Sequence, residues 1–257
     1  MATGIHSVAA MDFKDHFSAH AASYADARPG YPDELFEWLA LQCPRRRLAW
    51  DAGCGNGQAS VALAGYFGEV YATDPSAAQI TAAQKHERVH YAVESAEDCG
   101  LGDHTANLVT VAQAYHWFQH ERFCEEARRV LATDGVVALW SYAESMVNPD
   151  VDAVVNELHH GTLENDWPPE RQHVLDRYRD LPFPFRAISP PAFEMRSFWN
   201  LPQYMAYLSS WSASQRYVKR TGTDPVAAAA PAMREAWGNP EQVRMVEWPL
   251  LVLAGRR

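Results

Sequence analysis

The sequence has few cysteines and no long apolar run. Its four cysteines, at positions 43, 54, 99 and 124, form no C-x-x-C pair, which argues against a disulfide framework and for reduced thiols. There is no run of about 18 apolar residues, and the first residues lack the basic-then-apolar pattern of a signal peptide. We therefore expect a cytoplasmic protein with no membrane span and no membrane partner.

Positive charge is also scarce. The chain has 22 Lys and Arg residues against 32 Asp and Glu, a net charge of −10. General nucleic-acid binders carry a basic footprint, so we expect a small-molecule partner and no nucleic acid. With 257 residues, 47% of them hydrophobic, the chain can bury one substantial core and a small second lobe. The composition is compatible with a monomer or a homodimer.

The sequence does contain a glycine-rich turn at the end of an apolar strand. Residues 48–58 read LAWDAGCGNGQ, with Asp51 followed by glycines at positions 53, 55 and 57. Glycine lets the backbone turn sharply and leaves no side chain between its N–H groups and a ligand, as nucleotide-type cofactors require. A dinucleotide fingerprint would place its third glycine at position 58, which is Gln58. The spacing therefore disfavours NAD.

An acidic residue stands where such a fold needs one. Asp74 follows the expected strand 69–73, about twenty residues beyond the loop, where a carboxylate can grip a ribose diol with two hydrogen bonds. Pro75 and Ser76 then begin another helix. The alternative is a structural turn with helix-capping carboxylates. The alternation of strands and helices around the loop favours cofactor binding.

The D-x-G-x-G-x-G pattern resembles that of class I S-adenosylmethionine (SAM) dependent methyltransferases, in particular the type 11-like group. A third expected strand, 88–93, leads into Ala96 and Glu97, where the resemblance implies adenine contacts, and a fourth, 106–112, leads into Gln113. The implied cofactor is SAM and the implied product S-adenosylhomocysteine. The cofactor-binding residues implied in this way are Asp51, Gly53, Gly55, Asn56, Gly57, Gln58, Asp74, Pro75, Ser76, Ala96, Glu97 and Gln113.

Strands alternating with helical patterns over residues 48–142 predict an α/β fold with a parallel sheet and helices on both faces. The resemblance implies a Rossmann-like sheet of seven strands, the last one antiparallel and next to the fifth, with a helical C-terminal insertion lobe. We expect the last two strands at 193–199 and 243–255, with a helical run at 200–237 between them. The expected division is an N-terminal helical lid at 1–44, a SAM-binding core at 45–145, and a substrate lobe plus the last two strands at 146–257.

The N-terminal segment is similar to the leader of a methyltransferase subgroup that includes the trans-aconitate methyltransferases. The similarity rests on residues 24–32, YADARPGYP, in which Pro32 suits the start of a helix. It implies a lid over SAM, with Tyr24 and Arg28 facing the cofactor or the substrate. The alternative is that Tyr24 and Tyr31 pack the leader onto the sheet.

The segment after the fourth strand lies beside the reacting methyl in enzymes of this family. We interpret Trp117 and Tyr142 as walls of the site, and His116 and Tyr142 as the candidates for a catalytic base or hydrogen-bond donor. The alternative is a strand end with core aromatics, because Trp and His often pack without taking part in chemistry.

The C-terminal lobe is rich in arginine and aromatic residues. An arginine fork binds a carboxylate through two hydrogen bonds, so Arg186 and Arg216 are candidate substrate-binding residues, with Trp211 as an aromatic wall. The alternative is that the arginines form surface salt bridges and the aromatics form a core.

One zinc-protease pattern, H-E-x-x-H at residues 86–90, lies outside the helix that zinc binding would need, because residues 88–93 alternate like a strand. His116 and His120 have helical spacing but no evident third ligand. We predict no metal.

Three functions are compatible with these patterns. The first is SAM-dependent methyl transfer to a small molecule, with a carboxylic acid as a candidate acceptor, by direct in-line displacement. The second is a SAM-binding protein without turnover, with a regulatory or scaffold role. The third is an NAD(P)-dependent enzyme, which Gln58 disfavours.

Overall fold

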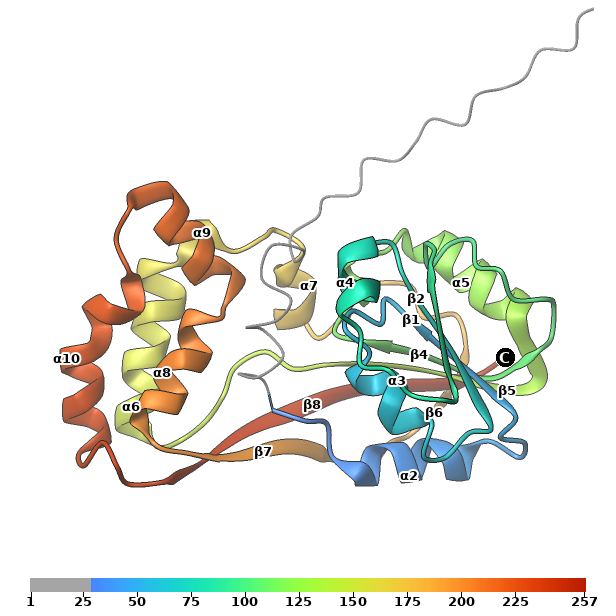
Figure 1. Cartoon of the computed structure of the whole chain (residues 1–257), viewed down its shortest axis with the longest axis horizontal. Helices are drawn as coiled ribbons and strands as arrows, with labels where there is room; N and C mark the ends of the chain where they lie inside the picture. The colour runs from blue at the N-terminus through green and yellow to red at the C-terminus, as the bar shows by residue number, and fades with distance from the viewer. Residues whose placement is uncertain (1–28) are drawn as a thin grey trace, which may run out of the picture.

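The computed structural model describes residues 29–257 (Figure 1), so Tyr24 and Arg28 lie outside the described residues. The described chain contains one eight-stranded sheet in the order β3-β2-β1-β4-β5-β8-β6, with β7 paired to another part of β8. Strands β1 to β5 are parallel, and β8 is antiparallel to β5, β6 and β7. The strands are β1 (Leu48–Ala52), β2 (Glu69–Asp74), β3 (Val89–Val93), β4 (Ala106–Ala112), β5 (Leu131–Ser141), β6 (Arg186–Ile188), β7 (Phe193–Trp199) and β8 (Arg244–Arg256).

Helices pack on both faces of the sheet, as the alternation of elements predicts. Alternate residues of β5 contribute to two separate apolar cores, one shared with α2 and α3 and the other with α5. Phe36 of α2 meets Trp140 of β5 edge-on, with ring centroids 6.0 Å apart, so α2 forms part of the core. These helices and their neighbour are α2 (Asp33–Gln42, after Pro32 as N-cap), α3 (Gln58–Leu63), α4 (Ala77–Ala82) and α5 (His120–Val130).

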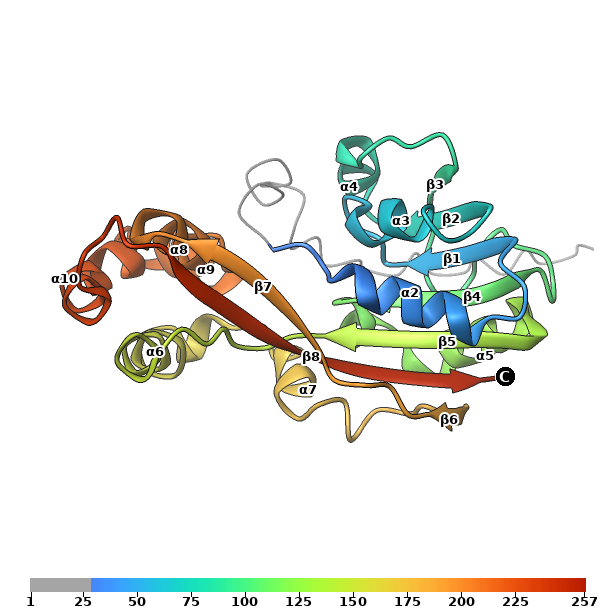
Figure 2. The ribbon, with the colours of Figure 1, turned by 90° about the horizontal axis from the view of Figure 1, so that it is seen from below.

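Strand β8 joins the sheet to the C-terminal lobe. Its residues 251–256 pair with β5, whereas residues 244–250 pair with β7, so the two long strands continue beyond the parallel sheet to the helices of the lobe (Figure 2). The strands expected at 193–199 and 243–255 are present as β7 and β8, but the short strand β6 was not expected. Strands β6 and β7 are separated at residues 189–192, where Pro190 and Pro191 have no N–H to donate to the ladder. The sheet therefore has eight strands instead of seven.

The lobe is helical, as expected. The run at 200–237 is divided into three helices, because Gly222 ends α9 with φ of 75° and the Asp224 side chain then accepts the Val226 and Ala227 N–H groups at the start of α10. A π-helical turn, Glu157–Thr162, follows α6 directly. The helices of this region are α6 (Pro149–Asn156), α7 (Arg171–Leu175), α8 (Leu201–Ser209), α9 (Ser212–Thr221) and α10 (Pro225–Trp237).

Buried aromatic residues hold the lobe onto β8. Tyr204, Tyr207, Trp237 and Trp248 are at most 2% exposed. The Trp248 Nε1–H donates to Tyr207 Oη at 3.0 Å, so these two polar groups are hydrogen-bonded although they are buried. Burial of a large apolar side chain stabilises a fold by roughly 1.5–3 kcal/mol, so this cluster accounts for the attachment of the lobe. Among residues 29–257, no helix is long and apolar enough to cross a membrane.

Candidate active site

The glycine-rich loop connects the end of β1 to the start of α3. Gly53, Gly55 and Gly57 have φ of 68°, 53° and 84°, values that residues other than glycine rarely adopt. At Gly57 an added Cβ would lie 2.1 Å from Tyr91 Oη, so both backbone conformation and space require glycine there. The sequence pattern therefore corresponds to a tight turn with three glycines in the left-handed region.

Hydrogen bonds fix this loop to its neighbours. Asp51 is fully buried, and its carboxylate accepts hydrogen bonds from Ser60 Oγ at 2.6 Å and Thr110 Oγ1 at 2.9 Å. Burial raises the pKa of this carboxyl to about 6 despite the two hydroxyl donors. The Asn56 carbonyl accepts the Gln84 N–H at 2.9 Å. Asp51 therefore supports the loop from beneath by joining β1 to α3 and β4.

Asp74 lies at the end of β2, beside the loop, as expected. Its two carboxylate oxygens accept the N–H groups of Gly55 and Ser76, both at 2.9 Å. Ser76 caps α4 by accepting the Gln79 N–H, and Pro75 lies between the two. A carboxylate can accept about four hydrogen bonds, so holding these two backbone groups is compatible with gripping a ribose diol.

Gln58, Ala96 and Glu97 are further residues predicted to bind the cofactor. Gln58 Nε2 donates to the Pro29 carbonyl at 3.1 Å, which ties the segment before α2 to the loop. Ala96 is 4% exposed, and the Glu97 carboxylate accepts the Gln119 N–H at 2.8 Å at the start of α5. An adenine contact at Ala96 and Glu97 stays a prediction.

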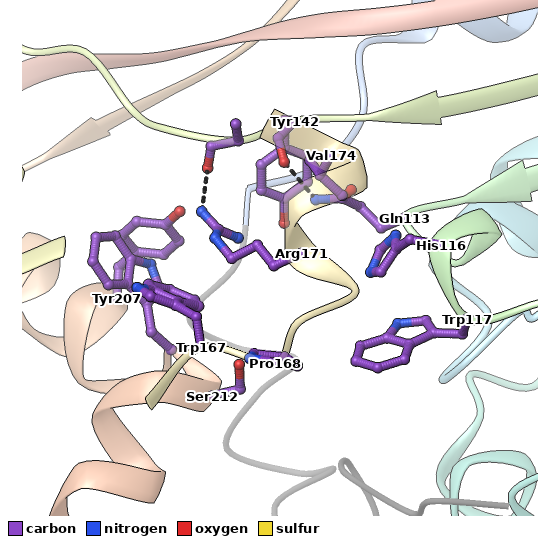
Figure 3. Close-up of a pocket in the computed structure, with 12 residues that line it drawn as sticks. Gln113, His116, Trp117, Tyr142, Trp167, Pro168, Arg171, Val174, Tyr207 and Ser212 are labelled. Atoms are coloured by element: carbon purple, nitrogen blue, oxygen red, sulfur yellow. Dashed lines mark hydrogen bonds between the residues drawn. The ribbon is translucent and has the colours of Figure 1, made fainter. Parts of the chain in front are cut away.

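A pocket opens between the sheet and the lobe, at the carboxyl ends of β4 and β5 (Figure 3). This is where open α/β sheets bind ligands. The pocket adjoins the glycine loop, because an added Cβ on Gly53 would touch Ala114 and Phe118 of the segment after β4. The lining residues are Gln113, His116, Trp117, Tyr142, Ala143, Trp167, Pro168, Arg171, Val174, Tyr207, Trp211 and Ser212.

Gln113 has strained backbone geometry and an unpaired acceptor at the edge of this pocket. Its φ is 55°, and its Nε2 donates to the Tyr142 carbonyl at 2.9 Å. Its Oε1 is buried and has no hydrogen-bond partner among the described residues. Such strain and unpaired polar atoms are concentrated at functional sites. Together with the glycine turn and Asp74, this acceptor fits a polar cofactor such as SAM, which these residues would hold.

His116 is on the short 3-10 turn Tyr115–Trp117, and its ring lies beside Trp117 in the pocket wall. Its Nδ1 is 3.0 Å from Tyr178 Oη, so this hydrogen bond uses Nδ1 and not Nε2. Burial, reinforced by the positive charge of Arg171, lowers the pKa of His116 to about 3. The imidazole is therefore neutral at ordinary pH and is a weak proton acceptor.

Arg171 brings positive charge to the pocket. Its guanidinium lies 4.0 Å from the centre of the Trp167 ring, and its Nη2 is 3.5 Å from the Ala143 carbonyl (Figure 3). The same Nη2 is 2.9 Å from His159 Nε2. Among the twelve lining residues it is the only one with a permanent charge. Sequence reasoning missed Arg171, because neither a motif nor a distinctive spacing surrounds it.

The structure brings some of the predicted substrate residues together and not others. Trp117, Tyr142 and Trp211 line the pocket as predicted. Arg186 is exposed on β6, where its backbone stands opposite Arg256 of β8 in the ladder. Arg256 lies toward the end of the sheet that is away from the pocket. Arg216 is half-buried on α9 and is not a lining residue. The aromatic part of the site was thus predictable, whereas its arginine was not.

Comparisons with known proteins agree with this geometry. Residues 50–139 match the family described as a methyltransferase domain. A Dictyostelium discoideum protein named as a methyltransferase is 36% identical over 216 residues, which cover 82% of each chain. CRG1 of Saccharomyces cerevisiae, named as a SAM-dependent methyltransferase, is 31% identical over 51% of this chain and 47% of its own length.

A solved structure supports the same assignment. A protein of Anaeromyxobacter dehalogenans named as a type II methyltransferase superposes with a TM-score of 0.84 at 48% identity, covering 89% of this chain and 97% of that one. The glycine turn, the carboxylate at the end of β2 and the strand order agree with the family that these relatives share. The chain therefore belongs to the class I SAM-dependent methyltransferases.

Proposed function

We propose that the protein methylates a small carboxylic acid that carries an aromatic or apolar body. The observation that supports this most is Arg171, the one permanently charged side chain among aromatic and apolar pocket walls. In a chain with a net charge of −10, a cation at this place favours a substrate anion that would otherwise be repelled. A guanidinium binds a carboxylate through two parallel hydrogen bonds.

The weak basicity of the site supports an acceptor that needs no deprotonation. No carboxylate is among the twelve lining residues, and the pKa of His116 is lowered to about 3. A catalytic base works best with a pKa near the operating pH, so His116 is poorly matched to remove a proton from an amine or a hydroxyl. A carboxylate acceptor is already ionised and needs no such base.

SAM supplies a methyl group on a sulfonium sulfur, which is a good leaving group. The bond from methyl to sulfur breaks as the bond to the acceptor oxygen forms, giving an ester and S-adenosylhomocysteine without release of a proton. The pocket residues then act by alignment, which can contribute about 7–11 kcal/mol. Arg171 acts in binding, because the acceptor carboxylate loses its charge as it is methylated. An acid with a second carboxylate can keep that group on the guanidinium, consistent with the leader similar to that of trans-aconitate methyltransferases.

The test is release of S-adenosylhomocysteine from SAM over a panel of monocarboxylic acids, dicarboxylic acids, phenols and amines. We expect turnover on acids, with KM raised in Arg171→Met and kcat less affected. Arg186→Ala is the matched control, because it removes an exposed arginine far from the pocket and should leave KM unchanged. Turnover confined to amines or phenols, or an unchanged KM for acids in Arg171→Met, would contradict the proposal.

Binding of SAM without turnover on any member of the panel would favour the regulatory or scaffold alternative. We also propose that the methyl acceptor is a small molecule and that the protein is a monomer or a homodimer. Calorimetric SAM binding measured in parallel separates a missing substrate from a failure to bind the cofactor.

A further inference from the structure

A cluster of two histidines and one glutamate lies behind the wall of the pocket. Glu144 follows β5, and His159 and His160 are in the π-helical turn Glu157–Thr162. One ligand atom from each of these three residues lies within 4.8 Å of the other two. Short π-helical segments are rare and are frequently found at functional sites. None of the three residues belongs to the cofactor loop or to the twelve that line the pocket, but His159 contacts Arg171 of the pocket.

The donor atoms match a borderline-soft divalent cation such as Zn²⁺. His160 Nε2 is 2.7 Å and His159 Nδ1 3.8 Å from Glu144 Oε1. Ligands of a tetrahedral zinc ion at about 2.0–2.1 Å stand roughly 3.3 Å apart, so the two distances to Glu144 each differ from the tetrahedral value by about half an ångström. His159 is 2% exposed, and its Nδ1 has no hydrogen-bond partner among the described residues. Glu144 and His160 are at least a third exposed, which gives an ion a path from solvent.

Arg171 competes with this role of His159. The Nε and Nη2 of Arg171 both point at His159 Nε2, at 3.2 and 2.9 Å, so the ring accepts there and its proton lies on Nδ1. When Nδ1 binds a metal, the proton moves to Nε2, and two donors then face each other. Ion binding therefore requires Arg171 to release His159.

We propose that Glu144, His159 and His160 form a binding site for a divalent cation of the Zn²⁺ class, with water completing the coordination, and that the ion and the Arg171–His159 hydrogen bond exclude each other. Such a site would couple metal occupancy to the position of a pocket residue. The proposal does not depend on the identity of the methyl acceptor, because its readout is metal binding alone.

The test is calorimetric titration of the full chain with Zn²⁺. Glu144→Gln and His160→Gln change exposed side chains and should each weaken binding by at least the ~10-fold that is typical of outer-shell changes. Arg171→Met keeps an unbranched apolar side chain beside Trp167 but removes the charge and the donors, so the variant should bind Zn²⁺ more tightly. His90→Gln, an exposed histidine on β3, is the matched control and should leave affinity unchanged.

Two results would overturn the proposal. Equal Zn²⁺ affinity in all variants would show that the cluster does not hold the ion. Weaker binding in Glu144→Gln and His160→Gln with no change in Arg171→Met would restrict the ion to the surface pair, without His159. The absorption spectrum of Co²⁺ added to the same variants provides a second measurement, since tetrahedral and octahedral coordination give different intensities.

Discussion

Replacing Asp74 with alanine should weaken SAM binding more than any other single change on the loop side of the site. The carboxylate holds the N–H groups of Gly55 and Ser76 at 2.9 Å and stands where a ribose diol would bind. Hydrogen bonds to a charged group contribute about 1.5–3 kcal/mol each, so losing two to the ribose removes about 3–6 kcal/mol, or roughly 10²- to 10⁴-fold in Kd. Calorimetric titration with SAM measures this directly.

The control for this experiment lies on the same strand. Glu69→Ala removes the same charge at the exposed far end of β2 and should leave the SAM Kd unchanged. Thermal unfolding of both variants checks that the sheet is intact. If folded Asp74→Ala bound SAM within about threefold of the wild-type affinity, the placement of the ribose at this carboxylate would be wrong.

Three further outcomes are expected. Gly57→Ala should destabilise the fold more than Gly222→Ala in urea denaturation, because both positions have positive φ but only Gly57 places a Cβ 2.1 Å from Tyr91 Oη; equal losses would show that the contact is relieved without cost. The pKa of His116, lowered to about 3, predicts that its ring proton signals do not titrate near pH 6.5 in NMR, and that its contribution to stability is lost as pH falls below about 6.5, where the unfolded chain takes up the proton first. Asp51, whose pKa is raised to about 6, has the opposite effect on stability, because the folded state holds the carboxyl proton more tightly than the unfolded chain does. The protonated carboxyl stabilises the fold below pH ~4, and about 3 kcal/mol of unfolding free energy is lost by pH ~6. A wild-type pH profile of unfolding free energy that matches that of Asp51→Asn would refute this prediction.

Residues close in sequence were the ones whose roles could be predicted. The spacing of Asp51, the three glycines and Asp74 predicted a cofactor loop at the ends of β1 and β2, and the structure has this loop. The periodicity of apolar residues also predicted where the parallel strands lie in the sequence, because the alternation of side chains is a local property. The short strand β6 was missed, although Pro190 and Pro191, which separate it from β7, were visible in the sequence.

The substrate side of the site depends on contacts between distant segments. Arg171 reaches the pocket because α7 packs against the turn Tyr115–Trp117, and because Trp167 and His159 hold its guanidinium there. Arg186 was an equally good candidate by composition, but the pairing of β6 with β8 places it at the other end of the sheet.

The sequence by itself thus determined the fold class, the cofactor loop and the family, since these depend on short-range spacing, on glycines whose conformation no other residue replaces, and on strands that pair in a fixed order. Only the tertiary structure decided which arginine faces the pocket, that the pKa of His116 is lowered by burial, and that Glu144 meets two histidines fifteen and sixteen residues further along the chain. The physical reason is that charge, burial and ligand geometry depend on distances in space, which a linear sequence does not fix for segments joined through a separate lobe.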